Sequence, residues 1–527
     1  MNSPYTRVRL LLCRGLVTTV VAGSASSVSR LAARWAGAAL IAGAASGCSS
    51  GIEPPRAAAT SAAVPRVWTY EVEAGLRAEQ LRVHAQLPPG VPAELGVDRF
   101  AHPFLRDLEL KTTHGWRPIA PTGAEWHVPE CRELGCELRY HYALAQAAAK
   151  IDRFEFAGIR GGVVLAPPST WLIHPRDYTG ADRYRFRVTT QAGLGFASGV
   201  SRSGRADGSR EGPAELLFQA PYSGFATFRQ EQLPVPGGVI QLSVGQSGAP
   251  LALTPEALRS ALREAAALVS DYFGRFPVRD LAVIVVPSEG SEMFGMQLGN
   301  GGASILLFMG RGVVDVSPRQ DWVLVHEMFH LGFPSVIRRH VWLAEGLATY
   351  QEPLARARAG LIDEQQLWAE FSSGMPKGLP GPDDGGLDGT RSWGRTYWGG
   401  ALFCLLADLA IRSESQQRLS LDDAMRGILA AGGDTAVRWT MLETLAAGDR
   451  AIRASTLQDL YREHADRAVA VDLPALFRRL GVRWEGKQVV FDDDAEWAPL
   501  RRALTARPLP HGAQLGLAVP GVPKSPL

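Results

Sequence analysis

The segment His326-Glu327-Met328-Phe329-His330 constrains this chain more than any other, because it specifies a helix and what one face of that helix holds. Residues four apart lie on the same face of an α-helix, so both imidazoles can reach one ion. Glu327 lies between them in sequence and is offset around the helix, where it can accept a proton from water. The segment therefore predicts a helix that binds a metal ion beside a general base.

A third metal ligand is predicted at Glu345, separated from His330 by fourteen residues. The gap contains a turn, Gly332-Phe333-Pro334, and a basic link, Arg338-Arg339-His340, so the chain can fold back toward the same ion. Zinc takes nitrogen and oxygen ligands in a tetrahedron, and a catalytic site leaves one position open. With His326, these residues predict a site for one Zn²⁺ ion.

Three further groups complete the predicted site. Tyr397 begins the next predicted helix and can donate a hydrogen bond to an oxyanion without adding charge, although aromatic packing is an alternative role. Glu352 follows Glu345 by seven residues on the same helix face, where it either holds a ligand in place or is a solvated acid. The segment Gly301-Gly302-Ala303-Ser304 precedes a predicted strand, and we expect it to bind an extended substrate as an added strand.

Several segments resemble known peptidase families. Together with the first motif, Trp342-Leu343-Ala344-Glu345-Gly346-Leu347-Ala348-Thr349-Tyr350 resembles the gluzincin metallopeptidases. Tyr397-Trp398-Gly399-Gly400-Ala401 is similar to the Tyr-x-Lys-Gly-Ala segment of the aminopeptidase N and glycyl aminopeptidase families, with Gly399 in place of the Lys. The segments 406–412 and 421–425 resemble the glycyl aminopeptidase family most. The resemblance implies a thermolysin-like catalytic fold, zinc and peptide-bond hydrolysis.

The same resemblance assigns roles to individual residues. The metal ligands, the general base and the oxyanion-stabilising tyrosine of these families map to His326, His330 and Glu345, to Glu327, and to Tyr397. Relatives carry Gly-x-x-Glu upstream of the motif, where the Glu binds the free amine of the substrate. The matching stretch here ends in Ser304, so the choice between aminopeptidase and endopeptidase stays open.

The first 48 residues predict export. Two apolar stretches, 10–22 and 35–45, lie among arginines with no acidic residue, and both are shorter than the ~20 residues that span a bilayer. Ala45-Ser46-Gly47-Cys48-Ser49 resembles a bacterial lipoprotein signal, in which Cys48 becomes the lipidated first residue of the mature chain. This predicts a membrane-attached lipoprotein of the bacterial cell envelope that faces the periplasm. Ordinary signal cleavage, an N-terminal membrane anchor and a start downstream of Met1 are alternatives.

The length of 527 residues suggests about three folded units, at roughly 150 residues each. We expect a multi-domain α+β protein with a β-sandwich-like N-terminal domain, a thermolysin-like, mainly helical zinc peptidase domain and a helical C-terminal region. In the N-terminal domain we expect strands at 67–72, 81–87, 137–142, 184–189 and 215–219. The segments are 1–48 (signal), 49–64 (flexible tether), 65–240 (β-rich), 241–440 (catalytic), 441–505 (helical) and 506–527 (loose tail).

Cys131 and Cys136 flank a four-residue loop, and an exported protein meets an oxidising compartment, which predicts a disulfide. A zinc site with His127 and His141 is the alternative at these cysteines. Cys404 lies in an apolar helical pattern and is expected in the core.

The net charge of the chain limits which classes of partner it can bind. A net charge of +2, with no long run of Lys and Arg after the N-terminal segment, argues against a nucleic-acid partner. We therefore predict an exported zinc metallopeptidase that acts on peptides or proteins. The alternative is a cell-envelope binding or assembly protein that retains a gluzincin fold, which the β-rich N-terminal region and the missing amine-binding Glu favour. The sequence does not determine the oligomeric state.

Overall fold

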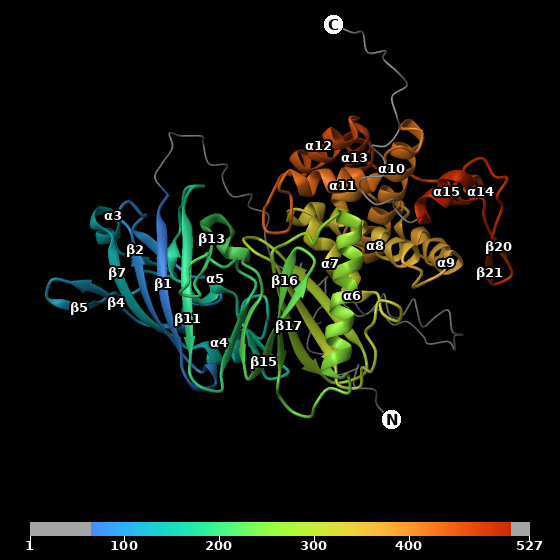
Figure 1. The fold of residues 1–527 in the computed structure, drawn as a ribbon. Coiled ribbons are helices and arrows are strands. Elements are labelled where there is room, and N and C mark those ends of the chain that lie inside the picture. The colour runs from blue at the N-terminus through green and yellow to red at the C-terminus, as the bar shows by residue number, and fades with distance from the viewer. Residues whose placement is uncertain (1–64, 507–527) are drawn as a thin grey trace, which may run out of the picture. The chain divides into compact units, whose positions relative to one another are not determined.

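Alternating apolar and polar residues form the strands of a seven-stranded sheet at the N-terminal end. In β1 (Val67–Ala74) and β2 (Leu81–Leu87) every second side chain is buried, as in a strand with one face on a core. The strand order is β13-β11-β1-β2-β7-β4-β5. The computed structural model describes residues 65–506, coloured in Figure 1. The other strands are β4 (Leu105–Thr112), β5 (Gly115–Pro118), β7 (Cys136–Tyr142), β11 (Arg183–Thr190) and β13 (Arg210–Pro213).

The predictions for residues 1–64 and 507–527, including lipidation of Cys48, lie outside the described residues. Between residues 65 and 506, every helix is too short or too polar to cross a bilayer.

Two smaller sheets pack with the seven-stranded sheet around an aromatic core. The Trp171 ring lies edge-on to Phe186 and Phe225, at 5.5 and 6.3 Å between ring centroids, and all three residues are buried. The sheet-rich N-terminal region is thus as predicted. The smaller sheets are β10 (His174–Pro175), β3 (Glu94–Gly96) and β6 (Trp126–His127), and β12 (Gly195–Ser198), β14 (Ser223–Ala226), β9 (Val163–Leu165) and β8 (Gly158–Arg160).

Short helices connect these strands. Cys131 of α3 (Pro129–Leu134) and Cys136 of β7 form a disulfide, the pairing expected from the sequence. The expected strand at 215–219 is instead a 3₁₀-helix, η3 (Ala214–Gln219), in which the consecutive residues Leu216 and Leu217 are both buried. The other short helices are η1 (Leu76–Ala78), η2 (His102–Phe104), α4 (Leu144–Ile151) and α5 (Pro168–Trp171).

A second sheet, ordered β15-β16-β17-β19-β18, carries the predicted catalytic part. Its central strands are parallel, and α6 (Pro255–Phe273) crosses between β16 and β17. The sequence Thr254-Pro255-Glu256 predicts a helix start with a capping hydroxyl, and Thr254 is the N-cap of α6. β18 is an edge strand, antiparallel to β19. The predicted domain boundary at residue 240 falls inside β16. The strands are β15 (Phe228–Val235), β16 (Gly238–Gly245), β17 (Asp280–Ser288), β18 (Met293–Leu298) and β19 (Ser304–Gly310).

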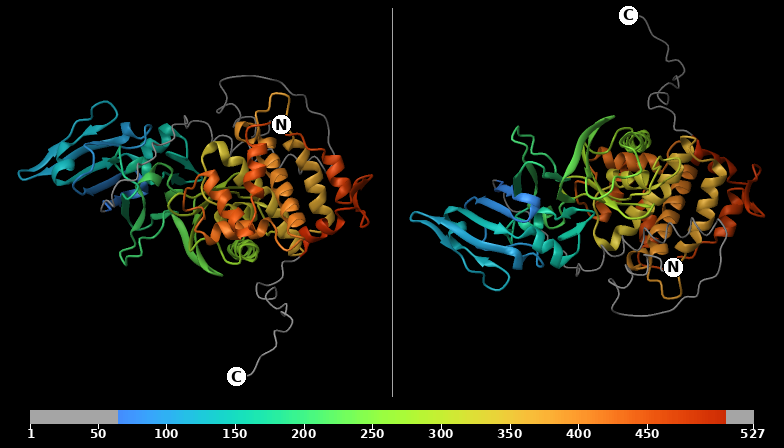
Figure 2. Two further views of the ribbon diagram at one scale, coloured as in Figure 1. Left: turned by 90° about the horizontal axis from the view of Figure 1, so that it is seen from above. Right: turned by 90° about the horizontal axis from the view of Figure 1, so that it is seen from below.

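Helices form most of the chain from residue 311 to residue 506, with one hairpin of two strands near its end, and the helices from α8 to α13 pack side by side in both views of Figure 2. α8 (Val341–Arg358) continues past Pro353, where the sequence predicts an end or a kink, so the proline is tolerated inside this helix. The other elements are α7 (Val323–Phe329), η4 (His330–Gly332), η5 (Arg338–His340), α9 (Glu364–Gly374), η6 (Met375–Gly378), η7 (Leu387–Gly389), the π-helical turn η8 (Arg395–Gly399), α10 (Gly400–Glu414), α11 (Leu421–Ala430), α12 (Met441–Ile452), α13 (Thr456–His464), α14 (Leu473–Arg479), β20 (Val482–Glu485), β21 (Gln488–Phe491) and α15 (Ala498–Thr505).

Candidate metal centre

The apolar residues of α7 pack in the core and fix the helix, so that His326 and the following His330 are directed toward the same position. Every residue of α7 is buried. The Phe329 ring packs edge-on against Tyr272 of α6, with 5.1 Å between the centroids. His326 in α7 and His330, which begins η4 directly after it, lie one turn apart with ring centroids 5.0 Å from each other. The packing of α7 therefore fixes the orientation of both imidazoles.

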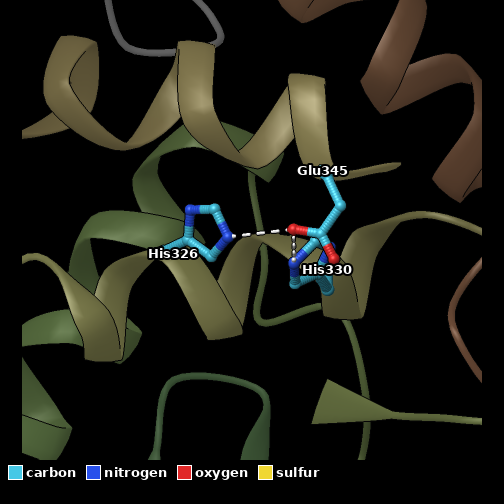
Figure 3. A group of neighbouring side chains, drawn as sticks. All are labelled: His326, His330 and Glu345. Atoms are coloured by element: carbon cyan, nitrogen blue, oxygen red, sulfur yellow. Dashed lines mark hydrogen bonds and ion pairs between the residues drawn. The ribbon is translucent and has the colours of Figure 1, made fainter. Parts of the chain in front are cut away.

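Helix α8 brings Glu345 to the same point, as the sequence predicts. Figure 3 shows the carboxylate reaching from α8 toward the two imidazoles. Glu345 Oε2 lies 3.3 Å from His326 Nε2 and 3.5 Å from His330 Nε2. The next residue, Gly346, contacts the backbone of Gly400 so closely that a Cβ there would lie 2.3 Å from the Gly400 Cα. This glycine lets α8 pack directly on α10.

The three side chains fit the requirements of zinc. Their donor atoms lie within 4.8 Å of one another. Tetrahedral zinc with bonds of about 2.0–2.1 Å separates its ligands by ~3.3–3.4 Å, which matches the distances from Glu345 to both imidazoles. Two imidazole nitrogens and one carboxylate oxygen are also a ligand set of catalytic zinc sites.

The charges of these groups are coupled. Burial would raise the pKa of Glu345, but His330 and His326 together hold it well below its usual value. Burial lowers the pKa of His326. At His330 the effect of burial is outweighed by the Glu345 carboxylate, so its pKa is raised. The ionised carboxylate thus compensates for the desolvation of the histidines.

Glu327 lies between the metal-site histidines and the edge strand β18. Its side chain is buried, and burial raises its pKa to about 7. The backbone N–H of Gln297 donates a hydrogen bond to it and lowers the pKa in part. Gly295 faces the same carboxylate, since a Cβ at that position would lie 2.4 Å from Glu327 Cγ. A group with a pKa near 7 can both accept and release a proton at neutral pH.

Tyr397 reaches the site from the π-helical turn η8. Its ring is stacked on the His326 imidazole at 6.2 Å and also contacts Trp393 at 5.6 Å, so it takes part in aromatic packing as well as facing the metal ligands. Burial raises the pKa of its phenol far above the usual value, and the carboxylates of Glu345 and Glu327 raise it further. The phenol therefore stays protonated and can donate a hydrogen bond.

Glu352 is fully buried and pairs with Arg356, so it has neither of the two predicted roles, support of a metal ligand or a solvated acid. Its Oε1 accepts a hydrogen bond of 2.7 Å from Arg356 Nη1, on its own helix, and its Oε2 has no hydrogen-bond partner among the described residues. Seven residues of helix carry Glu352 about 10 Å along α8 from Glu345. Sharing a helix face with a ligand is thus insufficient to place Glu352 against the site.

The segment Gly301-Gly302-Ala303-Ser304 cannot bind a substrate strand either, contrary to the prediction. Ser304 is fully buried, where its Oγ accepts a hydrogen bond from the Tyr222 N–H and donates one to the Leu298 carbonyl. Gly302 pairs with Val200 of the N-terminal region. β19, which begins at Ser304, has neighbours on both sides, so no substrate strand can add to it.

The free edge next to the metal site belongs to β18 instead. Reasoning from the sequence missed Gly295 and Gln297, which lie on this strand and contact Glu327. Their segment has no alternation of apolar and polar residues, and its glycine weakened the signal for a strand. The one sequence feature that could have revealed β18 is its position shortly before the strand that begins at Ser304.

No protein-family model matches the chain, and no curated protein matches it. Among solved structures, it is similar to an aminopeptidase N family protein from Idiomarina loihiensis, with 12% identity over 79% of this chain and 78% of that one and a TM-score of 0.58. It is also similar to an M1 zinc metallopeptidase from Deinococcus radiodurans, in a form bound to a Tyr-Ser-Ala substrate, with 17% identity, 78% and 95% coverage and a TM-score of 0.47.

The first of these similarities establishes the fold. The chain shares the fold of this aminopeptidase N family protein. The predicted resemblance to this family is therefore confirmed at the level of the fold. Its closer likeness to glycyl aminopeptidases stays a prediction.

Proposed function

We propose that this chain is a zinc-dependent metallopeptidase whose catalytic part, residues 241–440, is thermolysin-like. The observation that carries the proposal is the convergence of the His326, His330 and Glu345 donor atoms within 4.8 Å, beside the buried Glu327. The fold shared with an aminopeptidase N family protein supports the same reading.

The residues of the site suit the hydrolysis of a peptide bond. Zinc in such a site activates water and polarises a carbonyl oxygen. Glu327 accepts a proton from the attacking water and delivers it to the leaving amine, which its pKa of about 7 permits. Tyr397 donates a hydrogen bond to the oxyanion that forms at the attacked carbonyl.

We further propose that the substrate is a peptide or protein segment that binds as an added strand along β18. The edge of β18 is unpaired within the described sheet and lies against Glu327 through Gly295. Main-chain hydrogen bonds to an edge strand hold an extended peptide regardless of its sequence. This arrangement is compatible with both aminopeptidase and endopeptidase action.

Replacement of Glu327 by Gln tests the proposal. We expect the variant to bind one zinc ion, as the wild type does, and to lose hydrolysis by a factor of at least about 10³, because no group then accepts the proton. Digestion of a peptide library, read by mass spectrometry with and without a chelator, measures this. The exposed Glu289→Gln variant is the control and should keep its activity. A zinc-loaded wild type that cleaves no peptide would contradict the proposal.

We also propose that the chain is exported and anchored through a lipid on Cys48. The lipoprotein-like sequence around that residue supports this location. Metabolic labelling with a fatty acid should label the wild type and not Cys48→Ser, and the label should follow the membrane fraction. Equal labelling of both proteins would overturn the assignment.

A further inference from the structure

The loop between α11 and α12, residues 431–440, joins three parts of the catalytic region. The Asn300 N–H donates to the Thr435 carbonyl at 2.9 Å, which ties the loop to the chain after β18. The Thr435 N–H donates to the Leu331 carbonyl at 3.1 Å, and Ser335 Oγ donates to the Thr435 carbonyl at 2.9 Å. The loop is thus fixed to both the edge strand and the segment that follows the metal-site helix.

Side chains extend this connection to the general base. Gln297 Nε2 donates a 2.8 Å hydrogen bond to Thr435 Oγ1. The backbone N–H of the same Gln297 donates to Glu327. The loop therefore lies at the Leu298 end of β18, where Gln297 contacts both Thr435 of the loop and Glu327.

Arg438 lies in the same loop and reaches η3 beside Asn300, since both side chains donate a hydrogen bond to Gln219. Its Nη2 donates to Gln219 Oε1, and its guanidinium lies over the Phe218 ring at 5.1 Å from the centroid. Its Nε is buried and has no hydrogen-bond partner among the described residues, and none of their carboxylates forms an ion pair with it. Burial lowers the pKa of Arg438, an effect that Glu215 and Tyr178 oppose.

The neighbouring Asn300 also has a polar atom without a partner, but this atom is an acceptor. Its Nδ2 donates to the Gln219 carbonyl at 3.2 Å, while its buried Oδ1 has no partner among the described residues. A half-buried guanidinium without a directly bound anion is costly, because part of its hydration is lost and Glu215 acts on it only from beyond ion-pair distance. The planar fork of arginine matches a carboxylate, with which it forms two parallel hydrogen bonds.

We propose that Arg438 binds a carboxylate of the substrate, so that this chain prefers peptides with an acidic group beyond the Leu298 end of β18. The inference rests on the peptidase function proposed above and specifies its substrate class. The carboxylate is that of an Asp or Glu side chain or of the peptide C-terminus. Both supply the same bidentate partner.

Matched peptides test the assignment. Each pair differs only by Glu or Gln at one position, and a further pair differs only by a free or amidated C-terminus. We expect wild-type kcat/KM to be about 10-fold higher for the acidic member of one pair, mainly through KM, since a charged hydrogen-bonded pair contributes that much. The pair that shows the effect identifies the source of the carboxylate.

Variants locate the effect at Arg438. In Arg438→Gln the ratio between the paired peptides should fall to about one, and Arg438→Lys should retain part of it. Arg462→Gln, on an exposed part of α13, should keep the wild-type ratio. A wild type that cleaves both members of every pair equally, or an Arg438→Gln variant that keeps the preference, would overturn the proposal.

A second measurement separates this proposal from the peptidase function. Binding of the same fluorescent peptides to Glu327→Gln, measured by anisotropy, does not depend on turnover. If the wild type cleaves nothing, the peptidase function fails, and the ratio of dissociation constants still decides for or against Arg438. That ratio should be about 10 with Arg438 and about one with Gln at this position.

Discussion

Gly295 controls how closely β18 approaches the metal-site helix. A Cβ at this position would lie 2.4 Å from Glu327 Cγ and 2.8 Å from Val323 Cγ1, so any other residue would displace the Glu327 side chain or the strand. The residue has no functional group of its own. Its contribution is the space that it leaves for a carboxylate next to a strand edge.

The proposed role of Tyr397, donation of a hydrogen bond to the oxyanion, depends on its phenol hydroxyl. We expect Tyr397→Phe to lower kcat by about 10²–10³-fold, the usual loss when one oxyanion donor is removed, with little change in KM. The ring contacts with His326 persist in Phe, so zinc content should not change. Steady-state kinetics and metal analysis measure both quantities. Tyr70→Phe, in the N-terminal sheet, is a matched control. A raised KM at unchanged kcat would contradict the oxyanion role.

The ligand residues were predictable from the sequence because helical spacing alone places His326 and His330 on one face. The placement of Glu345 needed only a turn in the intervening chain. Gln297 was not predictable, because its contact with Glu327 depends on which strand forms the edge of the sheet. Strand order is set by long-range packing, and no local pattern encodes it.

At the scale of elements, Asp388 of η7 fastens the beginning of α8. Its buried carboxylate accepts hydrogen bonds from the link before the helix, from the helix itself and from α13. Burial would raise its pKa, but these hydrogen bonds outweigh the effect and lower it. The donors are His340, Trp342 and Tyr461, at 2.8–2.9 Å, and Arg339 at 3.0 Å.

Because the folded-state pKa of Asp388 is depressed, its stabilisation is present above the unfolded pKa and is lost as the pH falls through the folded pKa. We expect Asp388→Asn to lower the free energy of unfolding by about 2–4 kcal/mol at pH 7. At pH 3 the difference from the wild type should shrink. Urea unfolding at both pH values measures it. Asp466→Asn, an exposed partner of the same Arg339, should have little effect. If Asp388→Asn lowers the free energy of unfolding equally at both pH values, the ionised carboxylate of Asp388 is not the source of the stabilisation.

Helix starts were predictable where a side chain caps them. Thr254 caps α6 as expected, because its hydroxyl accepts from the Ala257 N–H at 3.2 Å. Of the two predicted effects of Pro353, an end or a kink, the end was wrong, since α8 is buried over most of its length and its packing outweighs the lost hydrogen bond. Local chemistry thus predicted beginnings better than ends.

For the whole molecule, a metal ion bound by His326, His330 and Glu345 would connect α7 to α8 and contribute to stability. Ligand binding stabilises the folded state by about 4 kcal/mol when zinc is at a thousand times its Kd. We expect a chelator to lower the Tm of the wild type and to leave that of His330→Ala nearly unchanged. Differential scanning calorimetry measures both. Equal shifts in the two proteins would show that the chelator acts elsewhere.

The unpaired edge of β18 has a consequence for turnover. If a substrate binds along β18 as proposed, a fragment released by cleavage keeps the main-chain groups that held the intact substrate, so a long product leaves more slowly than a short one. We therefore expect product inhibition that grows with the length of the fragment, and an enzyme of this design would work fastest where short fragments diffuse away.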